Sequence, residues 1–102
     1  MISEEKQKIL QELGGIPEEV YDELVEEFKQ QYKTQIVRLR EALVAGDLTE
    51  ARMNAHSISG TSGNLRLYGM HQAAKALEVS IKEAQGRDVI DRNFKALEEI
   101  TL

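Results

Sequence analysis

Residues 17–46 read PEEVYDELVEEFKQQYKTQIVRLREALVAG, and this stretch has the apolar spacing of one long helix. Pro17 suits a first helical position, where no N–H is needed, and Glu18 and Glu19 favour the positive end of a helix dipole. Apolar residues then recur every three or four positions, as one buried helix face requires. They are Val20, Leu24, Phe28, Tyr32, Ile36, Leu39 and Leu43. The pattern predicts a helix that ends near Ala45-Gly46 with one face in a core.

Similar signals predict four further helices. A short one begins at Ser3 and ends at Gly14-Gly15, and the run Asp47–Glu50 resembles a capping box that opens a helix reaching about Leu67. After a turn at Tyr68-Gly69, one helix ends at Gln85-Gly86, and another starts at Asp88 and continues to the C-terminus.

Short connections force neighbouring helices to run antiparallel, so the fold class is all-α: an up-and-down four-helix bundle with an additional short N-terminal helix. We expect a single domain over 1–102, with the short helix in 1–15 and the bundle in 17–102. The short helix is expected to cap one end of the bundle.

The composition argues against several classes of function. The chain has 102 residues, a net charge of −5, two histidines and no cysteine, so a nucleic-acid partner and a zinc site are not expected. No apolar stretch is long enough to span a bilayer, and the N-terminus lacks the pattern of a signal peptide. A cytoplasmic protein is expected. Hydrolase and oxidoreductase motifs are missing from the sequence.

His56 is the most informative single residue. The predicted inner stripe of its helix contains Ala51, Ala55, Ile58, Ser62 and Leu65, and helical geometry turns His56 roughly 130° away from that stripe. Gly60 falls on the same outer side, while Ser59 and Gly63 are expected on the flank between His56 and the core. Each glycine costs about 1 kcal/mol relative to alanine within a helix, which suggests that access to the imidazole matters. An ordinary surface histidine is the simpler alternative.

The run Ala55–Leu65, read as AHSISGTSGNL, resembles the signature A-H-x-L-K-G-x-x-x-x-L of histidine phosphotransfer (Hpt) domains. Phe28, the connection Ala45-Gly46-Asp47 and the run Ala76-Leu77-Glu78 also match the usual pattern of that family.

The resemblance implies a phosphorelay intermediate. His56 would accept a phosphoryl group from the aspartyl phosphate of a receiver domain, or from a kinase, and pass it to a response-regulator receiver. The chain would be a phosphoryl carrier without kinase or nucleotide-binding activity, and it would need no cofactor because the receiver brings the Mg²⁺. Receiver domains, and a hybrid sensor histidine kinase, are the implied partners, and a monomer is expected.

One position departs from the family pattern. Ser59 stands where a lysine is usual, three residues after the histidine, and a hydroxyl supplies no positive charge. Antiparallel pairing puts Lys75 and Lys82 near the level of His56, and Lys82 is the preferred substitute cation. Met53 is expected at a docking patch, and Phe28 is expected in the core at the edge of that patch, where it packs beneath the helix of His56.

Two alternatives stay open at this point. One is an Hpt-like module that docks receivers or kinases without phosphotransfer, which the missing lysine would favour. The other is a plain structural or oligomerising bundle whose motif match is a coincidence.

Overall fold

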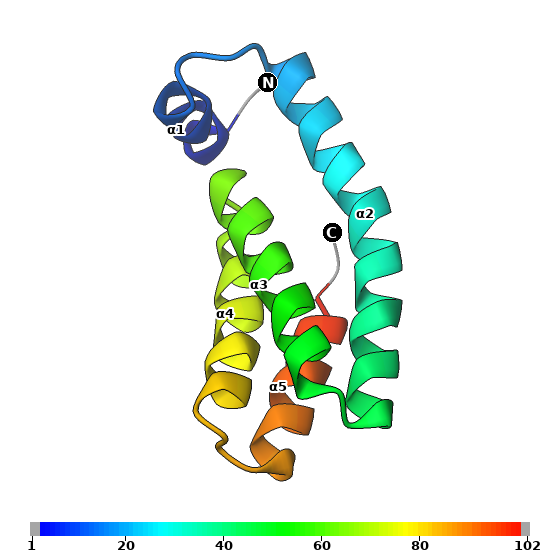
Figure 1. The fold of residues 1–102 in the computed structure, drawn as a ribbon. Helices are drawn as coiled ribbons and strands as arrows, with labels where there is room; N and C mark the ends of the chain where they lie inside the picture. Colours follow the sequence, from blue (N-terminus) through cyan, green and yellow to red (C-terminus); the bar gives the residue numbers. More distant parts are fainter. Residues whose placement is uncertain (1–2, 101–102) are drawn as a thin grey trace.

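The computed structural model describes residues 3–100, and within that range the chain forms five α-helices and no strand. Residues 1–2 and 101–102, the ends of the expected domain, lie outside the described residues. Figure 1 shows the helices in chain order. They are α1 (Glu4–Glu12), α2 (Glu18–Ala45), α3 (Leu48–Asn64), α4 (Tyr68–Lys82) and α5 (Arg87–Glu98).

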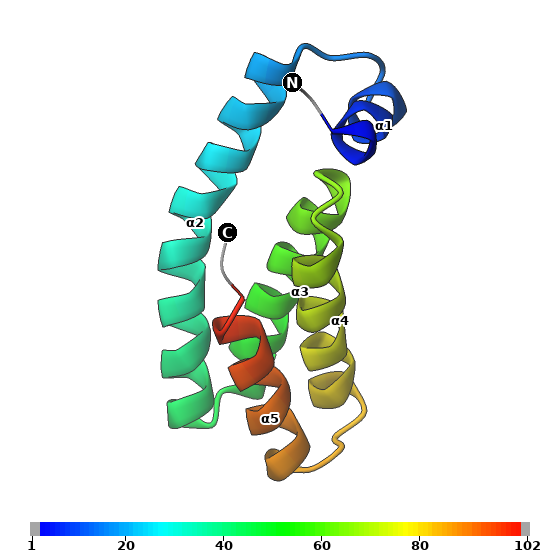
Figure 2. The same cartoon turned by 180° about the vertical axis from the view of Figure 1, so that it is seen from behind.

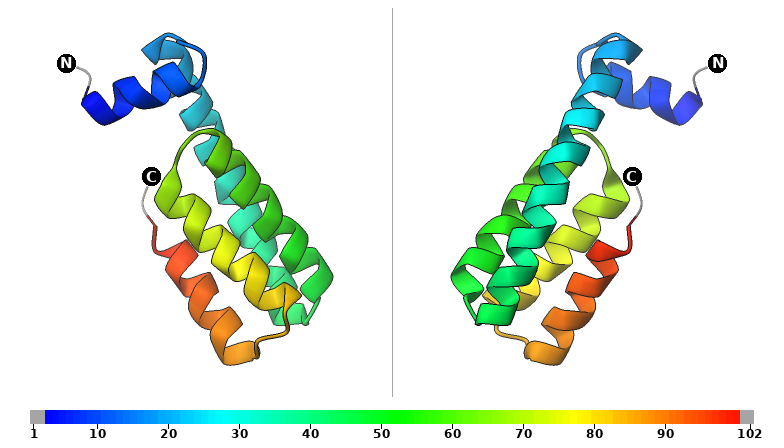
Figure 3. Two further views of the ribbon diagram at one scale, coloured as in Figure 1. Left: turned by 90° about the vertical axis from the view of Figure 1, so that its left-hand side faces the viewer. Right: turned by 90° about the vertical axis from the view of Figure 1, so that its right-hand side faces the viewer.

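Helices α2 to α5 run alternately up and down, which confirms the predicted antiparallel bundle (Figures 1 and 2). The connection between α2 and α3 is short, because Gly46 ends α2 and Asp47 caps α3. Gly46 adopts φ 74°, a left-handed conformation that glycine tolerates best, and Asp47 then accepts a hydrogen bond from the backbone N–H of Glu50. Figure 3 shows α3 and α4 side by side, with α2 against α3 and α5 against α4.

The first turns of α2 depart from the predicted burial. Val20 and Leu24 are 42% and 39% exposed, so the first part of the predicted apolar stripe is wrong. Tyr21 is buried in their place, and its hydroxyl donates to the backbone carbonyl of Leu65 over 2.6 Å. The reason is length: α2 has 28 residues, and its first turns extend past the ends of the shorter helices (Figure 1).

Helix α1 lies at the end of the bundle where α3 passes into α4, as expected of a capping helix (Figures 1 and 2). Ser3 caps its N-terminus by accepting from the N–H of Lys6. Leu10 joins the core, and the Glu12 carboxylate accepts from Arg66 over 3.1 Å. The helix ends at Glu12, earlier than the Gly14-Gly15 stop.

Several predicted boundaries are wrong by a few residues. Helix α3 passes both glycines as predicted but ends at Asn64, because the chain turns at Arg66, whose φ is 61°. Helix α4 starts at Tyr68, where a turn was expected, and ends at Lys82, so Ala84 is exposed beyond the helix rather than part of its inner stripe. The last helix begins at Arg87, one residue before Asp88, and ends at Glu98.

Within residues 3–100, no helix is both long enough and apolar enough to cross a membrane.

Candidate functional site

His56 lies on the outer face of α3, with 74% of its side chain exposed. Ala51, Ala55 and Ile58, from the predicted inner stripe, are fully buried. The prediction that His56 points away from the core is therefore confirmed. An exposed imidazole can reach a group on another protein without any opening of the bundle.

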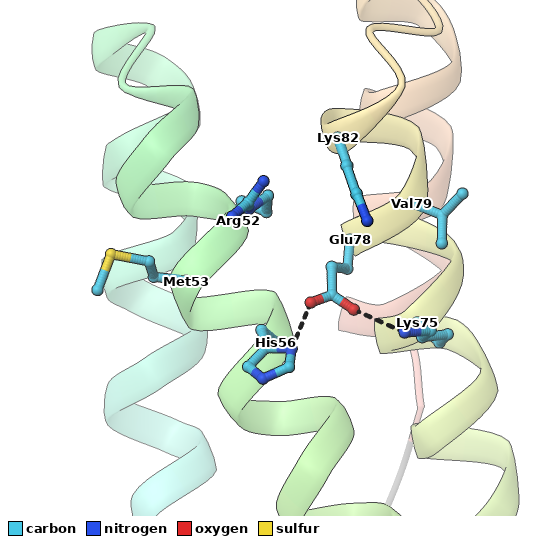
Figure 4. A pocket seen from close by; sticks show the side chains of 7 residues that line it. All are labelled: Arg52, Met53, His56, Lys75, Glu78, Val79 and Lys82. Carbon is cyan, nitrogen blue, oxygen red and sulfur yellow. Dashed lines mark hydrogen bonds and ion pairs between the residues drawn. The ribbon is translucent and has the colours of Figure 1, made fainter.

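The imidazole is held by Glu78 of α4, whose side chain is only 10% exposed (Figure 4). The Nδ1–H of His56 donates to one carboxylate oxygen of Glu78, and the Nζ of Lys75 donates to the other over 3.1 Å. Burial alone would raise the pKa of Glu78, but its interactions with Lys75 and His56, chiefly the two hydrogen bonds, outweigh burial and hold that pKa below its usual value.

An ionised carboxylate can only accept hydrogen bonds, so the bond to Glu78 requires a proton on Nδ1 of His56. In the neutral ring the other nitrogen, Nε2, then carries the free lone pair. The arrangement therefore selects one tautomer and directs the nucleophilic nitrogen away from Glu78.

Small side chains bring Glu78 to this position. Ala51 and Ala55 of α3 and Ala74 of α4 are fully buried, and such small residues let two helix backbones approach closely. Glu78 was not predicted from the sequence as the partner of His56. A signal was present, because Glu78 follows Leu77 and lies four residues after Ala74, which puts a carboxylate at the edge of a buried stripe.

A pocket of about 430 Å³ opens beside His56, between α3 and α4 (Figure 4). Lys75 and Lys82, the two lysines expected near the level of His56, both line it. Met53, expected at a docking patch, also lines the pocket and is 60% exposed. The remaining lining residues are Arg52, Glu78 and Val79.

Ser59 and Gly63 lie on the side of α3 that faces His71 of α4. Ser59 is 4% exposed, and its backbone carbonyl accepts from Nδ1 of His71 over 2.8 Å. A Cβ at Gly63 would come within 2.9 Å of the same ring nitrogen. Both residues therefore accommodate the half-buried ring of His71. The space that they leave is filled by that ring and is not open space beside His56.

Gly60 is different. It is exposed, and a Cβ built there would meet nothing within 4 Å. No packing contact requires glycine at this position, which leaves open space on the outer face one turn after His56.

Phe28 is 1% exposed and packs edge-to-face against Tyr32 of the same helix, with 6.1 Å between ring centroids. It lies in the core, as expected of a residue that packs beneath the helix of His56, but it is too buried to contact a docking partner itself. At the surface, α2 meets α3 through Gln35, whose amide donates to the hydroxyl of Ser57 over 2.8 Å.

Among residues 3–100, no three histidine, cysteine or acidic side chains gather in a way that could hold a metal ion.

A family model described as the Hpt domain matches residues 23–101. The match covers most of the chain, including His56, Glu78 and the whole pocket between α3 and α4, whereas α1 precedes it. Comparisons with curated proteins and with solved structures found no significant match.

The match to the Hpt model defines the class, because Hpt domains are in general phosphocarrier modules rather than enzymes. The chain belongs to the Hpt domain family. Members of this family serve histidine phosphotransfer in two-component phosphorelays, where they interact with receiver domains and kinases.

Proposed function

We propose that His56 accepts a phosphoryl group on Nε2 from the aspartyl phosphate of a receiver domain, or from a kinase, and passes it to a response-regulator receiver. The observation that carries this proposal is the bond from the Nδ1–H of the exposed His56 to the nearly buried Glu78. In the neutral imidazole this bond places the free lone pair on Nε2, which is the nitrogen available to a partner.

Phosphoryl transfer between the partner's aspartate and His56 needs no other reactant from this chain. The Nε2 lone pair attacks phosphorus, the N–P bond forms, and the P–O bond to the partner's aspartate breaks as that carboxylate leaves with the electron pair. The Nδ1 proton stays on the ring, and the ionised Glu78 stabilises the positive charge that the imidazole gains. Attack by the carboxylate of a second receiver reverses these steps and releases His56.

Access supports the same proposal. In-line transfer requires close approach between the histidine nitrogen and the partner's phosphoryl group. Gly60 leaves open space beside His56, and Met53 adds an exposed, flexible apolar contact. In this proposal Mg²⁺ belongs to the receiver, and the carrier is a cytoplasmic monomer that binds no cofactor.

The test is transfer of labelled phosphate from a panel of phosphorylated receivers. Wild-type protein should take up label that is lost in acid and stable in base, as expected for a phosphoramidate. His56→Gln should take up none, and His71→Gln, the matched control at the other histidine, should be labelled normally. Label retained by His56→Gln would contradict the assignment of His56.

A docking module that binds receivers without phosphotransfer is the second candidate. It is favoured by Ser59, which is buried and supplies no charge to the pocket. Receiver binding by wild-type protein without acid-labile label would support this candidate.

A further inference from the structure

Positive charge is concentrated around His56 in a chain whose net charge is −5. Three cationic side chains, Arg52, Lys75 and Lys82, line the pocket beside the imidazole, and Glu78 is its only acidic residue. The pocket therefore presents an excess of positive charge to any group that approaches His56.

The three cations are not equivalent. Both oxygens of Glu78 have donors, since one accepts from His56 and the other from Lys75. Arg52 and Lys82 make no ion pair or side-chain hydrogen bond in the part of the chain that the structure describes. These two side chains are therefore available to a ligand without breaking an existing contact.

Arg52 and Lys82 also lie on the same side of His56. Arg52 is four residues before His56 on α3, so the two share one helix face. Lys82 is four residues after Glu78 on the antiparallel α4, and Figure 4 shows its side chain running along α4 toward Glu78. Ser59 lies beyond His56 in the opposite direction along α3, and it is turned toward His71.

We infer that Arg52 and Lys82 together bind the phosphoryl oxygens of phosphorylated His56. The inference rests on the proposed phosphotransfer function. A phosphoryl group on Nε2 would be dianionic, and the guanidinium of Arg52 can bind two of its oxygens at once while Lys82 adds a point charge. The positive charge missing at Ser59 is thus supplied from the preceding turn of α3 and from α4.

The test compares Arg52→Gln, Lys82→Gln and the double variant with Lys95→Gln. Lys95 is an exposed cation of α5 outside the pocket, so its replacement changes the net charge as much as either single pocket variant does. Transfer from an aspartyl phosphate is measured at saturating receiver, together with receiver affinity and the half-life of phosphorylated His56. Circular dichroism verifies that each variant is folded.

We expect each pocket variant to slow transfer at saturating receiver by about ten-fold, equivalent to about 1.4 kcal/mol, and the double variant to slow it further. Phosphorylated His56 should also hydrolyse faster in these variants. Arg52→Lys and Lys82→Arg should recover most of the rate, while Lys95→Gln stays near wild type.

Two results would overturn the inference while leaving the proposed function intact. One result is that the pocket variants are labelled at His56 and show the same transfer rate and the same phosphohistidine half-life as Lys95→Gln. The other is a loss of receiver affinity alone, which would make Arg52 and Lys82 docking residues. Absence of label in wild-type protein would instead overturn the proposed function, and the inference with it.

Discussion

Glu78 is a nearly buried carboxylate that remains ionised because two donors from different helices bind it. Lys75 supplies one hydrogen bond within α4, and His56 supplies the other from α3. Burial raises the pKa of Glu78, and the two donors offset this effect. Removing either donor would therefore favour the neutral carboxyl. The tautomer of His56 therefore depends on the ionisation of Glu78, although Glu78 does not itself act as a nucleophile.

This balance predicts a pH dependence of stability. The folded-state pKa of Glu78 is below its ordinary value of 4.5, so its ionised form contributes to stability above that pH. The contribution is lost as pH falls through the lowered folded-state pKa. We expect Glu78→Gln to remove it, so that wild type and variant differ most in unfolding free energy near neutral pH and converge in acid. Urea denaturation across this range measures the difference.

Glu23→Gln is the matched control for that measurement. Glu23 is an exposed residue of α2 that takes part in none of the ion pairs found among residues 3–100. Its replacement should change the unfolding free energy little at any pH. A constant difference between wild type and Glu78→Gln from neutral to acid pH would contradict the prediction.

The spacing of α3 and α4 is set by residues with little or no side chain, and Gly63 is the tightest position. The ring of His71 occupies the space beside it and is held by the carbonyl of Ser59. The added methyl of Gly63→Ala must displace that ring or separate the helices. We expect a net loss of about 1 kcal/mol in unfolding free energy, since overpacking costs about 1–3 kcal/mol and the gain in helix propensity offsets about 1.

Gly60→Ala provides the matched comparison within the same helix. Its new methyl meets open space, so we expect a gain of up to about 1 kcal/mol from helix propensity alone. Chemical denaturation of the two variants should thus shift in opposite directions. Equal stabilisation by both substitutions would contradict the prediction, because it would show that the His71 ring can move aside without loss of stability.

The bundle could be predicted from the sequence because burial along a helix follows local periodicity. The spacing of apolar residues in α2 to α5, together with Gly46 and Asp47, was enough for the helix order and antiparallel topology. Burial at the ends was not predictable in this way. Val20 and Leu24 continue the stripe in sequence but extend past the neighbouring helices, and their exposure depends on the relative lengths of elements.

Features of the site were predictable from the sequence only where they depend on a single helix. The exposure of His56 follows from the face of α3 on which it lies. The contact with Glu78 depends on the register between α3 and α4, which no periodicity within either helix fixes. The burial of Ser59 against His71 has the same origin, because it needs two side chains from different helices at one level.

For the protein as a whole, α2 is the element to which both ends of the bundle are attached. The Tyr21 hydroxyl donates to Leu65 at the end of α3, and the Tyr32 hydroxyl donates to the carbonyl of Leu97 in α5 over 3.0 Å. Arg40 adds an ion pair with Glu98. These contacts join segments that are distant in sequence, so loss of one should lower the stability of the entire bundle.

Tyr32→Phe tests this cooperativity. The substitution keeps the ring but removes the hydroxyl that donates to the carbonyl of Leu97, which then retains only the bond from the N–H of Ile100, so we expect a loss of about 1 kcal/mol in unfolding free energy. Tyr68→Phe is the control, since Tyr68 is 49% exposed and should change stability little. Helix content and tyrosine fluorescence should report one shared transition, because α5 unfolds with the bundle. An earlier, separate loss of helix content in Tyr32→Phe would mean that α5 detaches on its own and that the hydroxyl stabilises only its docking.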